Sequence, residues 1–381
     1  MERKLASIQQ ISELRPIEGA DKIEVALMEG LGWECVVKKG EVNLGDYVVY
    51  FEIDSVLPER KEFEFLRDKK FRIRTIKLKG QVSQGLIMPL SILRESPSAA
   101  LNFVPHVGKD VTEMLGVTKY LSPSEREEEE REARLTLNKS KGLKKFLMRY
   151  KWFRDMVLPK RQGGDFPSWI SKTDEERLQN MPKVLTDYKD RKVYITEKID
   201  YQSATFTGRM VPKYNGLLGK LLKASKYEFI VCSRNRRVTD PNSLYMKVAD
   251  KYKIKEILEK YPNLTIQGEQ GDTKVQGNKY KIKEPSFWVF NIIDHVKRYH
   301  YDYDEMRMFC HEANLPLVPL DDIGSTLSDI GNTVQHFVEY SKGKSVLADI
   351  PREGIVVRCI ENGKKIFSFK VINPDFLLKY E

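Results

Sequence analysis

The segment YITEKIDYQSATF, residues 194–206, ends an apolar extended run with a lysine. Asp200 follows Lys198 two residues later, so both side chains share one face if the strand continues. A lysine amine beside a carboxylate and a metal ion can act as a covalent nucleophile. The same pair is also common as a surface ion pair, and these two residues alone leave both interpretations open.

Five short motifs follow this segment in order, over about 170 residues. They are SRN at 233–235, GE at 268–269, VFNIID at 289–294, EGIVVR at 353–358 and SFKVIN at 368–373. Each motif alone is unspecific, but the ordered series resembles the lysine nucleotidyltransferase superfamily of polynucleotide ligases and RNA-capping enzymes. The resemblance implies a nucleotidyltransferase domain of the DNA/RNA ligase and mRNA capping enzyme type.

The composition sets broad limits on the 381-residue chain, whose length suits about two to three domains. Its formal net charge of +10 favours a polyanionic partner, although a merely soluble basic surface would explain it equally well. Four scattered cysteines disfavour a zinc site or disulfide framework and fit a reducing, cytoplasmic location. We expect no membrane helix and no signal peptide, because no apolar run is long enough.

Residues 1–100 have the pattern of a small β-barrel. Alternating runs recur between Gly and Pro turn signals, namely KIEVALMEG, WECVVKKG, YVVYFEI, FRIRTIKLKG and GLIMPL. Residues 18–58 resemble oligonucleotide-binding (OB) barrels. The basic stretch 69–86 puts Arg72 and Arg74 on one strand face, which predicts either a groove for a nucleic-acid backbone or a solvated face.

Residues 101–165 are interpreted as a linker with charged and basic amphipathic helices. The run 125–134 has no apolar face, and 139–162 interleaves Lys and Arg with aromatic residues. The segment 139–162 could lie on nucleic acid, on a membrane surface or on its own domain, and we favour self-packing with nucleic-acid contact.

Residues 166–381 are interpreted as one mixed α+β domain, in which Asn362-Gly363 predicts a hairpin.

The flanking sequences narrow the resemblance. GKDVTEMLGVTKY (108–120) and FPSWISKTDEERLQN (166–180), with the OB-like N-terminal region, are similar to the ATP-dependent RNA ligase family represented in Deinococcus and Naegleria. Related DNA ligases and capping enzymes carry their OB module after the last motif, but only eleven residues follow Lys370 here. NAD-dependent DNA ligases are disfavoured by the absence of zinc-ligand cysteines. The expected architecture is an RNA-binding OB barrel followed by the nucleotidyltransferase domain.

This resemblance implies an RNA ligase that joins RNA 3′-OH and 5′-phosphate ends, with repair at nicks as its setting. Lys198 would attack ATP and form lysyl-AMP, the AMP would move to an RNA 5′-phosphate, and an RNA 3′-OH would displace it. Lys370 would be the second catalytic lysine, at the α-phosphate. The nucleotide-binding residues implied are Arg177, Glu197, Lys198, Arg234, Asn235, Glu269, Phe290, Val356 and Lys370.

Some of these residues have other interpretations. Phe290 and Val356 would sandwich the adenine, but residues of this kind also form the core of strands. Arg177 would contact the triphosphate, although a helix-capping or ion-pair role fits equally well. A protonated lysine cannot attack, and a nearby cation favours its neutral form. The resemblance therefore implies Mg²⁺ or Mn²⁺, held partly through water by Asp200, Glu269 and Glu353.

Two positions depart from the superfamily pattern. Tyr201 stands where the first motif usually has glycine, and Ser368 stands where the last motif often has lysine. Because glycine permits close backbone approach, Tyr201 is expected to narrow the site, change the nucleotide fit or lower activity. Two alternatives remain open, a non-catalytic RNA-binding protein with a degenerate ligase fold and another lysine nucleotidyltransferase. A monomer that acts on RNA is the default expectation.

Overall fold

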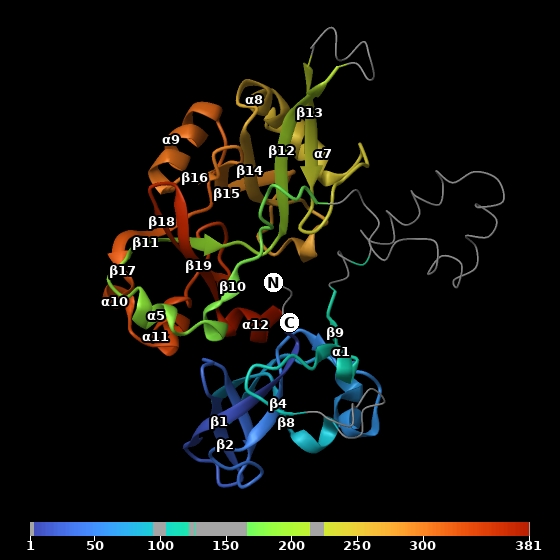
Figure 1. Ribbon diagram of the computed structural model, residues 1–381, viewed down its shortest axis with the longest axis vertical. Coiled ribbons are helices and arrows are strands. Elements are labelled where there is room, and N and C mark those ends of the chain that lie inside the picture. Colours follow the sequence, from blue (N-terminus) through green and yellow to red (C-terminus); the bar gives the residue numbers. More distant parts are fainter. Residues whose placement is uncertain (1–3, 94–103, 122–125, 127–165, 214–224, 381) are drawn as a thin grey trace, which may run out of the picture.

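A computed structural model describes residues 4–93, 104–121, 126, 166–213 and 225–380 of the protein. Figure 1 shows a smaller N-terminal body in blue and cyan, and a larger body coloured from green to red. The helices predicted within 125–134 and 139–162 lie outside the described residues, apart from Arg126. The described part of the predicted linker contains α1 (Thr112–Leu115) and β9 (Thr118–Lys119).

The N-terminal body is built on a curled sheet of five strands in the order β3-β2-β1-β4-β8. A register shift between Ile11 and Glu13 interrupts the pairing of the long central strand with β2. Such a bulge bends a strand and increases its twist, which lets one strand serve both halves of the curled sheet. The strands and 3-10 helices of this body are β1 (Ala6–Pro16), β2 (Ile23–Met28), β3 (Glu34–Lys38), β4 (Tyr47–Phe51), β5 (Ser55–Val56), η1 (Lys61–Lys69), β6 (Thr75–Leu78), β7 (Gln81–Gln84), β8 (Leu86–Pro89) and η2 (Leu90–Leu93).

Two features of this body differ from the sequence-based expectation. The central strand β1 was not predicted, because its sequence ASIQQISELRP is mostly polar, yet Ile8 and Ile11 are buried in the core. The placement of Arg72 on a strand face is wrong, since β6 begins only at Thr75. Arg72 is buried, 2.7 Å from the Asp54 carboxylate, and its guanidinium lies 3.6 Å from the centre of the Tyr120 ring. It therefore contributes to the fold rather than to an open groove.

The larger body consists of two five-stranded sheets, in the orders β10-β19-β18-β11-β17 and β13-β12-β14-β15-β16. The chain crosses between them at residues 199–201, because β11 ends at Lys198 and β12 begins at Gln202. The first motif therefore lies at the junction of the two sheets (Figure 1). The strands are β10 (Glu176–Arg177), β11 (Lys192–Lys198), β12 (Gln202–Pro212), β13 (Ser225–Cys232), β14 (Leu264–Gly271), β15 (Ser286–Asp294), β16 (Tyr299–His300), β17 (Leu320–Thr326), β18 (Gly354–Glu361) and β19 (Lys364–Ile372).

Helices pack on both sheets of the larger body. Val248, Leu258 and Met306 from three helices share one hydrophobic cluster with Ile266 and Phe287 of the second sheet. No helix in the described ranges has the length and apolar character that crossing a bilayer requires. The helices are η3 (Leu178–Asn180), α5 (Val184–Asp187), α7 (Leu244–Lys251), α8 (Ile254–Lys260), η4 (Gln276–Asn278), α9 (Tyr303–Ala313), α10 (Leu327–Ile330), α11 (Val334–Tyr340) and α12 (Pro374–Tyr380).

The hairpin predicted from Asn362-Gly363 is confirmed. Asn362 has φ 50° and Gly363 has φ 74°, and positive φ at both central residues is the geometry of a tight hairpin turn. This turn sets β18 against β19 in the register that pairs Val356 with Lys370. Glu353, immediately before β18, accepts a backbone hydrogen bond from Asn373 at 2.8 Å. The turn thus brings the last two motifs together.

The two bodies share side-chain contacts and part of one core. The Trp33 indole donates to the Asn180 side-chain oxygen at 2.5 Å, and the Gly32 amide donates to the Gln179 carbonyl at 2.7 Å. Helix α12 lies between the bodies (Figure 1), and its Leu377 belongs to the same hydrophobic cluster as the barrel residues. The N-terminal body is therefore packed against the larger body rather than merely tethered to it.

Gly354 permits the close approach of β18 and β19, so Gly354→Ala should destabilise the protein. Its φ is 154°, and a Cβ atom there would lie 2.1 Å from the Val371 carbonyl oxygen. We expect the free energy of unfolding, measured by urea titration, to fall by about 3 kcal/mol, because both backbone strain and overpacking contribute. Gly80→Ala is the control, since Gly80 also has positive φ, but a Cβ there meets nothing within 4 Å. It should cost only about 1 kcal/mol, and equal losses would refute the steric explanation.

Candidate active site

Lys198 is held beside Glu353 by the pairing of β11 with β18. In this register Lys198 lies opposite Gly354, and its Nζ is 2.7 Å from the Glu353 carboxylate. The two side chains are 25% and 13% exposed. Burial alone would lower the pKa of Lys198, but the charges of Glu353 and Glu269 outweigh it and hold the pKa above its ordinary value. In this state the amine is a protonated member of an ion pair.

Two more carboxylates surround this ion pair. The Tyr201 amide donates to Glu269 Oε1 at 3.2 Å, while Asp200 forms a short ion pair with the Lys279 amine. Burial raises the pKa of Glu269 to about 8, with the Lys198 charge opposing this rise and the Glu353 and Asp200 charges adding to it. Burial likewise raises the pKa of Glu353, although Lys198 opposes this. The mutual repulsion of three acids is thus only partly offset by the neighbouring amines.

These carboxylates have the donor chemistry expected for a divalent metal. Oxygen ligands suit Mg²⁺ and Mn²⁺, and a dication would relieve the repulsion among Asp200, Glu269 and Glu353. Among the described residues, however, no three His, Cys, Asp or Glu side chains are grouped closely enough to hold an ion. Lys198 and Lys279 instead form ion pairs with two of the carboxylates. The donor set fits a metal chemically, provided that these ion pairs open.

A cluster of cations surrounds Lys370, which is close to Lys198. β10 pairs in parallel with β19, so that Arg177 lies opposite Lys370. Burial, followed by the charges of Arg177 and Lys198, lowers the pKa of Lys370 to about 7. Arg234 forms an ion pair with Asp174 at 2.5 Å. An anion bound among these cations would stabilise their charges, as a polyphosphate does.

Arg177 joins this cluster to the N-terminal body. Its Nη2 is 3.6 Å from the Asp54 carboxylate, and its guanidinium lies 5.6 Å from the centre of the Trp33 ring. Its Nε and Nη1 are buried and make no hydrogen bond. The ion pair expected as one alternative is present, and the arginine keeps hydrogen-bonding capacity that the protein does not use. Its side chain makes no capping bond to η3.

The residues predicted for adenine come from both sheets. Val356 is buried in β18, and Phe290 is a partly buried residue of β15. The Arg358 guanidinium, on the same strand face as Val356, lies 5.6 Å from the centre of the Phe290 ring. Glu197 is buried and accepts hydrogen bonds from the Ser345 hydroxyl and the Val346 amide. Phe290 and Val356 can therefore both contact a base at the junction of the sheets. The Glu197 carboxylate is instead held by hydrogen bonds from the loop that contains Ser345 and Val346.

Asn235 and Ser368 each form a hydrogen bond with a neighbouring side chain. Asn235 is exposed, and its Oδ1 accepts from Lys172 Nζ at 3.3 Å. The Ser368 hydroxyl donates to Glu175 through a short hydrogen bond, and Glu175 also pairs with Arg358 at 3.2 Å. A serine at this position completes a buried network. Sequence reasoning gave no role to Asp174, Glu175, Lys279 or Arg358. The first two lie in the quoted segment 166–180, and Arg358 is the last residue of the quoted motif 353–358.

Tyr201 is accommodated by a glycine 70 residues further along the chain, Gly271. Its ring stacks on Trp288 at 6.1 Å and 3°, and a Cβ on Gly271 would lie 2.7 Å from it. Its hydroxyl donates to Asn278 at 2.9 Å, and only 5% of the residue is exposed. The expectation that this ring narrows the nucleotide site has no support in these contacts, because the ring is part of a hydrophobic cluster. Gly271 leaves room for the ring.

The fold and these side chains define a lysine nucleotidyltransferase of the polynucleotide-ligase class, preceded by an OB domain. Residues 5–90 match the family model of an OB-fold domain, and residues 191–372 match the model described as RNA ligase. The chain belongs to the RNA ligase family.

Solved structures of Naegleria gruberi RNA ligase are similar along the whole chain. The complex with PPi is 31% identical, covers 99% of each chain and superposes with a TM-score of 0.75. A variant solved with ATP and Mn is 30% identical, and the match covers 99% of the present chain and 98% of the Naegleria chain, with a TM-score of 0.73. A variant with AMP and Mn is 30% identical, covers 99% of both chains and has a TM-score of 0.72. No curated protein sequence matches significantly.

Replacing Tyr201 by the glycine usual in the superfamily should harm the protein. Tyr201→Gly leaves a cavity against Trp288 and Gly271, so we expect the free energy of unfolding to fall by about 3–5 kcal/mol in urea titrations. Tyr201→Phe keeps the ring and loses only the bond to Asn278, which should cost about 1 kcal/mol. A glycine variant as stable as the wild type would contradict this packing role.

The lowered pKa of Lys370 predicts a pH-dependent stability. Between pH 7 and the ordinary lysine value, the unfolded chain keeps a proton that the folded chain has lost. The free energy of unfolding of the wild type should therefore rise with pH relative to Lys370→Met, by up to about 1.4 kcal/mol per pH unit. Urea titrations at several pH values above 7 measure the difference. Lys364→Met, at an exposed position of the same strand, is the control and should show no such trend.

Proposed function

We propose that this protein is an ATP-dependent RNA ligase that joins RNA 3′-OH and 5′-phosphate ends, acting as a monomer at nicks during RNA repair. The carrying observation is the position of the Lys198 amine at the junction of two sheets, where the charges of three carboxylates act on it and where Lys370 is also close. The similar Naegleria gruberi structures contain ATP, AMP, PPi and Mn, which supports ATP and a divalent metal as requirements here.

Lys198 must first become a neutral amine. In the described state Glu353 stabilises the ammonium form, so the ion pair has to open before Nζ can present a lone pair. A divalent metal bound by Asp200, Glu269 and Glu353 would supply positive charge that favours the neutral amine and offsets charge on the phosphate oxygens. Lys279 would have to release Asp200 for the same purpose. The carboxylates would thus exchange their ion pairs with Lys198 and Lys279 for the metal ion.

In the first reaction, Nζ of Lys198 bonds to the α-phosphorus of ATP, and the bond from that phosphorus to pyrophosphate breaks. Lys370 is close enough to Lys198 to affect its charge, and its Nζ would donate to an α-phosphate oxygen. A bound phosphate would restore the proton that burial removes from this lysine. Arg177, with two unused buried nitrogens, would hold the β- and γ-phosphates until pyrophosphate leaves.

The nucleoside would be oriented by apolar and polar contacts. Phe290 and Val356 offer two apolar surfaces from opposite sheets, which suits the flat adenine ring. Arg234 and Asn235 would contact the ribose, and Glu197 would reach the adenine once its loop partners give way. These contacts fix the α-phosphorus relative to Nζ, which is the main requirement of phosphoryl and nucleotidyl transfer.

Two further transfers complete the proposed reaction. An oxygen of an RNA 5′-phosphate attacks the lysyl-AMP phosphorus, and the P–N bond to Lys198 breaks. The 3′-OH of a second RNA end then attacks that 5′-phosphate, forming the phosphodiester and releasing AMP. The OB body, packed on the larger body through Trp33 and Leu377, would hold the RNA across the junction during these steps.

The first test is the intact mass of the protein after incubation with ATP and Mg²⁺ or Mn²⁺. The wild type should gain one adenylate, and Lys198→Ala should gain none, because the only proposed acceptor is Nζ of Lys198. Lys192→Ala is the matched control, since Lys192 is exposed at the other end of the same strand. It should be labelled like the wild type. An adenylate on the Lys198→Ala protein would overturn the proposed mechanism.

The acceptor is tested with the adenylated protein and no free ATP. Nicked duplexes that carry RNA or DNA on each side of the nick are compared with single-stranded RNA ends. Release of AMP together with a joined strand is expected for RNA nicks. Joining of single-stranded ends alone would exclude nick sealing while leaving RNA ligation intact.

A further inference from the structure

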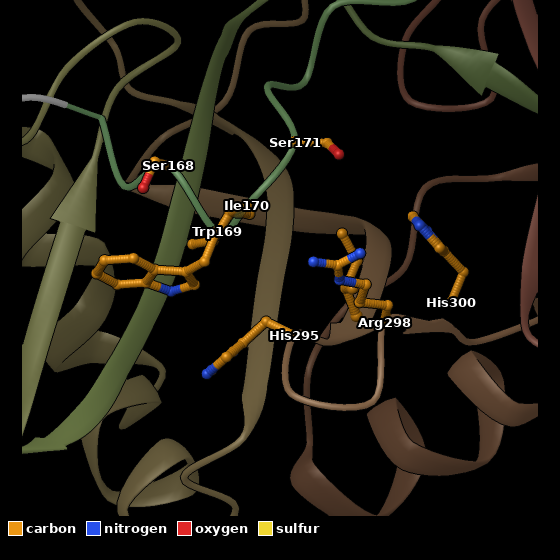
Figure 2. A pocket seen from close by; sticks show the side chains of 8 residues that line it. Ser168, Trp169, Ile170, Ser171, His295, Arg298 and His300 are labelled. Atoms are coloured by element: carbon orange, nitrogen blue, oxygen red, sulfur yellow. The ribbon is translucent and has the colours of Figure 1, made fainter.

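A cavity of about 350 Å³ lies between the segment 168–171 and the hairpin that joins β15 to β16. None of the residues predicted for adenylation lines it. Figure 2 shows its side chains, which come from these two chain segments. Ligand pockets in proteins have volumes of about 300 Å³ and above, so the space suits a small organic molecule of nucleotide size. It is lined by Ser168, Trp169, Ile170, Ser171, Ile293, His295, Arg298 and His300.

The hairpin holds one wall of this cavity in a fixed shape. Its strands pair Ile293 with His300, and the Asp294 carboxylate accepts from the backbone amides of residues 296 and 297 at 3.1 and 2.9 Å. Arg298 follows in the left-handed region, with φ 55°, which is uncommon for a side chain of this size. The turn therefore sets an exposed arginine at the cavity, which His295 and His300 also line.

Hydrogen bonds anchor the opposite wall to the second sheet. Gln267 donates to the Ser171 carbonyl at 2.9 Å, and Asn291 donates to the Gln267 side-chain oxygen at 2.9 Å. This fixes the segment that carries Trp169. The indole remains 37% exposed, and the Arg209 guanidinium lies 4.9 Å from its ring centre. An anchored, exposed indole is a surface on which a planar ring can stack.

The polar groups of the lining favour an anion. Among the eight lining residues, all of which the structure describes, there is one guanidinium, two imidazoles and two hydroxyls but no carboxylate. His295 uses Nδ1 on Thr265 at 3.1 Å, while the buried Nδ1 of His300 has no hydrogen-bond partner. Burial lowers the pKa of both histidines, with Asp294 opposing this at His295, so each ring favours its neutral form. Neutral rings can both donate and accept hydrogen bonds.

We propose that this cavity is a second nucleotide-binding site, separate from Lys198, that takes one ribonucleotide with its phosphate at Arg298 and its base on Trp169. A simple carboxylic acid would satisfy the guanidinium but leave the exposed part of the indole without a stacking partner, whereas a nucleotide uses both walls. The nucleotide can come from an RNA chain or from free solution, and the chemistry of recognition is the same. The RNA source rests on the proposed function.

The test is equilibrium binding of a 5′-phosphorylated uridine trinucleotide, labelled with a fluorophore at its 3′ end, to the full chain without ATP. Arg298→Gln should raise the dissociation constant at least about tenfold at fixed salt, as expected for the loss of a phosphate contact. Lys297→Gln is the matched control, because it removes the same charge from the same turn, where the side chain is 76% exposed and does not line the cavity. It should change binding less than about twofold.

Two further arms separate the possible outcomes. Unlabelled UMP competes with the trinucleotide if a free nucleotide is a ligand, and fails to compete if the cavity requires an RNA chain. Either result supports the site, provided that the dissociation constant depends on Arg298. Equal binding by Arg298→Gln, Lys297→Gln and the wild type overturns it. Trp169→Ala provides a second variant, which should also weaken binding at least about fivefold through lost stacking.

Adenylation of Lys198, followed by intact mass, distinguishes this proposal from the proposed function. Arg298→Gln should be adenylated like the wild type, because the cavity contains no residue of the adenylation site. A chain that never becomes adenylated but binds the trinucleotide through Arg298 would refute the ligase reaction and keep the second site. Failure of Arg298→Gln to become adenylated, in a folded protein, would refute the separation of the two sites.

Discussion

The pairing of Lys198 with Gly354 across β11 and β18 is the constraint on which the rest of the site depends. A shift of one residue in this register would turn the Lys198 side chain to the opposite face of the sheet. In the observed register, the amine meets Glu353 at 2.7 Å at the place where the chain passes to the second sheet. The β18–β19 hairpin then adds Lys370 opposite Val356. Two strand registers that share β18 therefore bring together residues from three distant motifs.

Charges around this register are divided into two groups. Carboxylates gather on the side of Asp200, Glu269 and Glu353, and cations gather around Lys370. Lys198 lies at the boundary and is influenced by both groups. Each group of like charges destabilises the folded protein, because burial removes the water that would otherwise solvate these charges. A nucleoside triphosphate bound with a divalent metal ion matches both groups. Its phosphates would neutralise the cations, and the metal ion would neutralise the carboxylates.

The sequence predicted the features that depend on short-range patterns. Asn362-Gly363 indicated the hairpin because only residues tolerant of positive φ fit that turn, and the motif series indicated the residues that meet at the junction. Strand β1 was not predicted because its sequence is mostly polar. Its pairing with β2 and β4, rather than its own β-propensity, stabilises it as a strand. The Tyr201–Gly271 fit and the Lys279–Asp200 pair join residues about 70 to 80 positions apart, and no local pattern reports such contacts. Tertiary contacts also explain why Arg72 is buried.

The contact of Leu377 with the barrel core has a consequence for biosynthesis. The barrel strands leave the ribosome before helix α12, which covers part of their apolar surface. During translation, the nascent barrel must expose this surface until α12 emerges. The barrel core is therefore completed only after α12 has been synthesised, and a chain that lacks this helix would expose an apolar patch for chaperones to recognise.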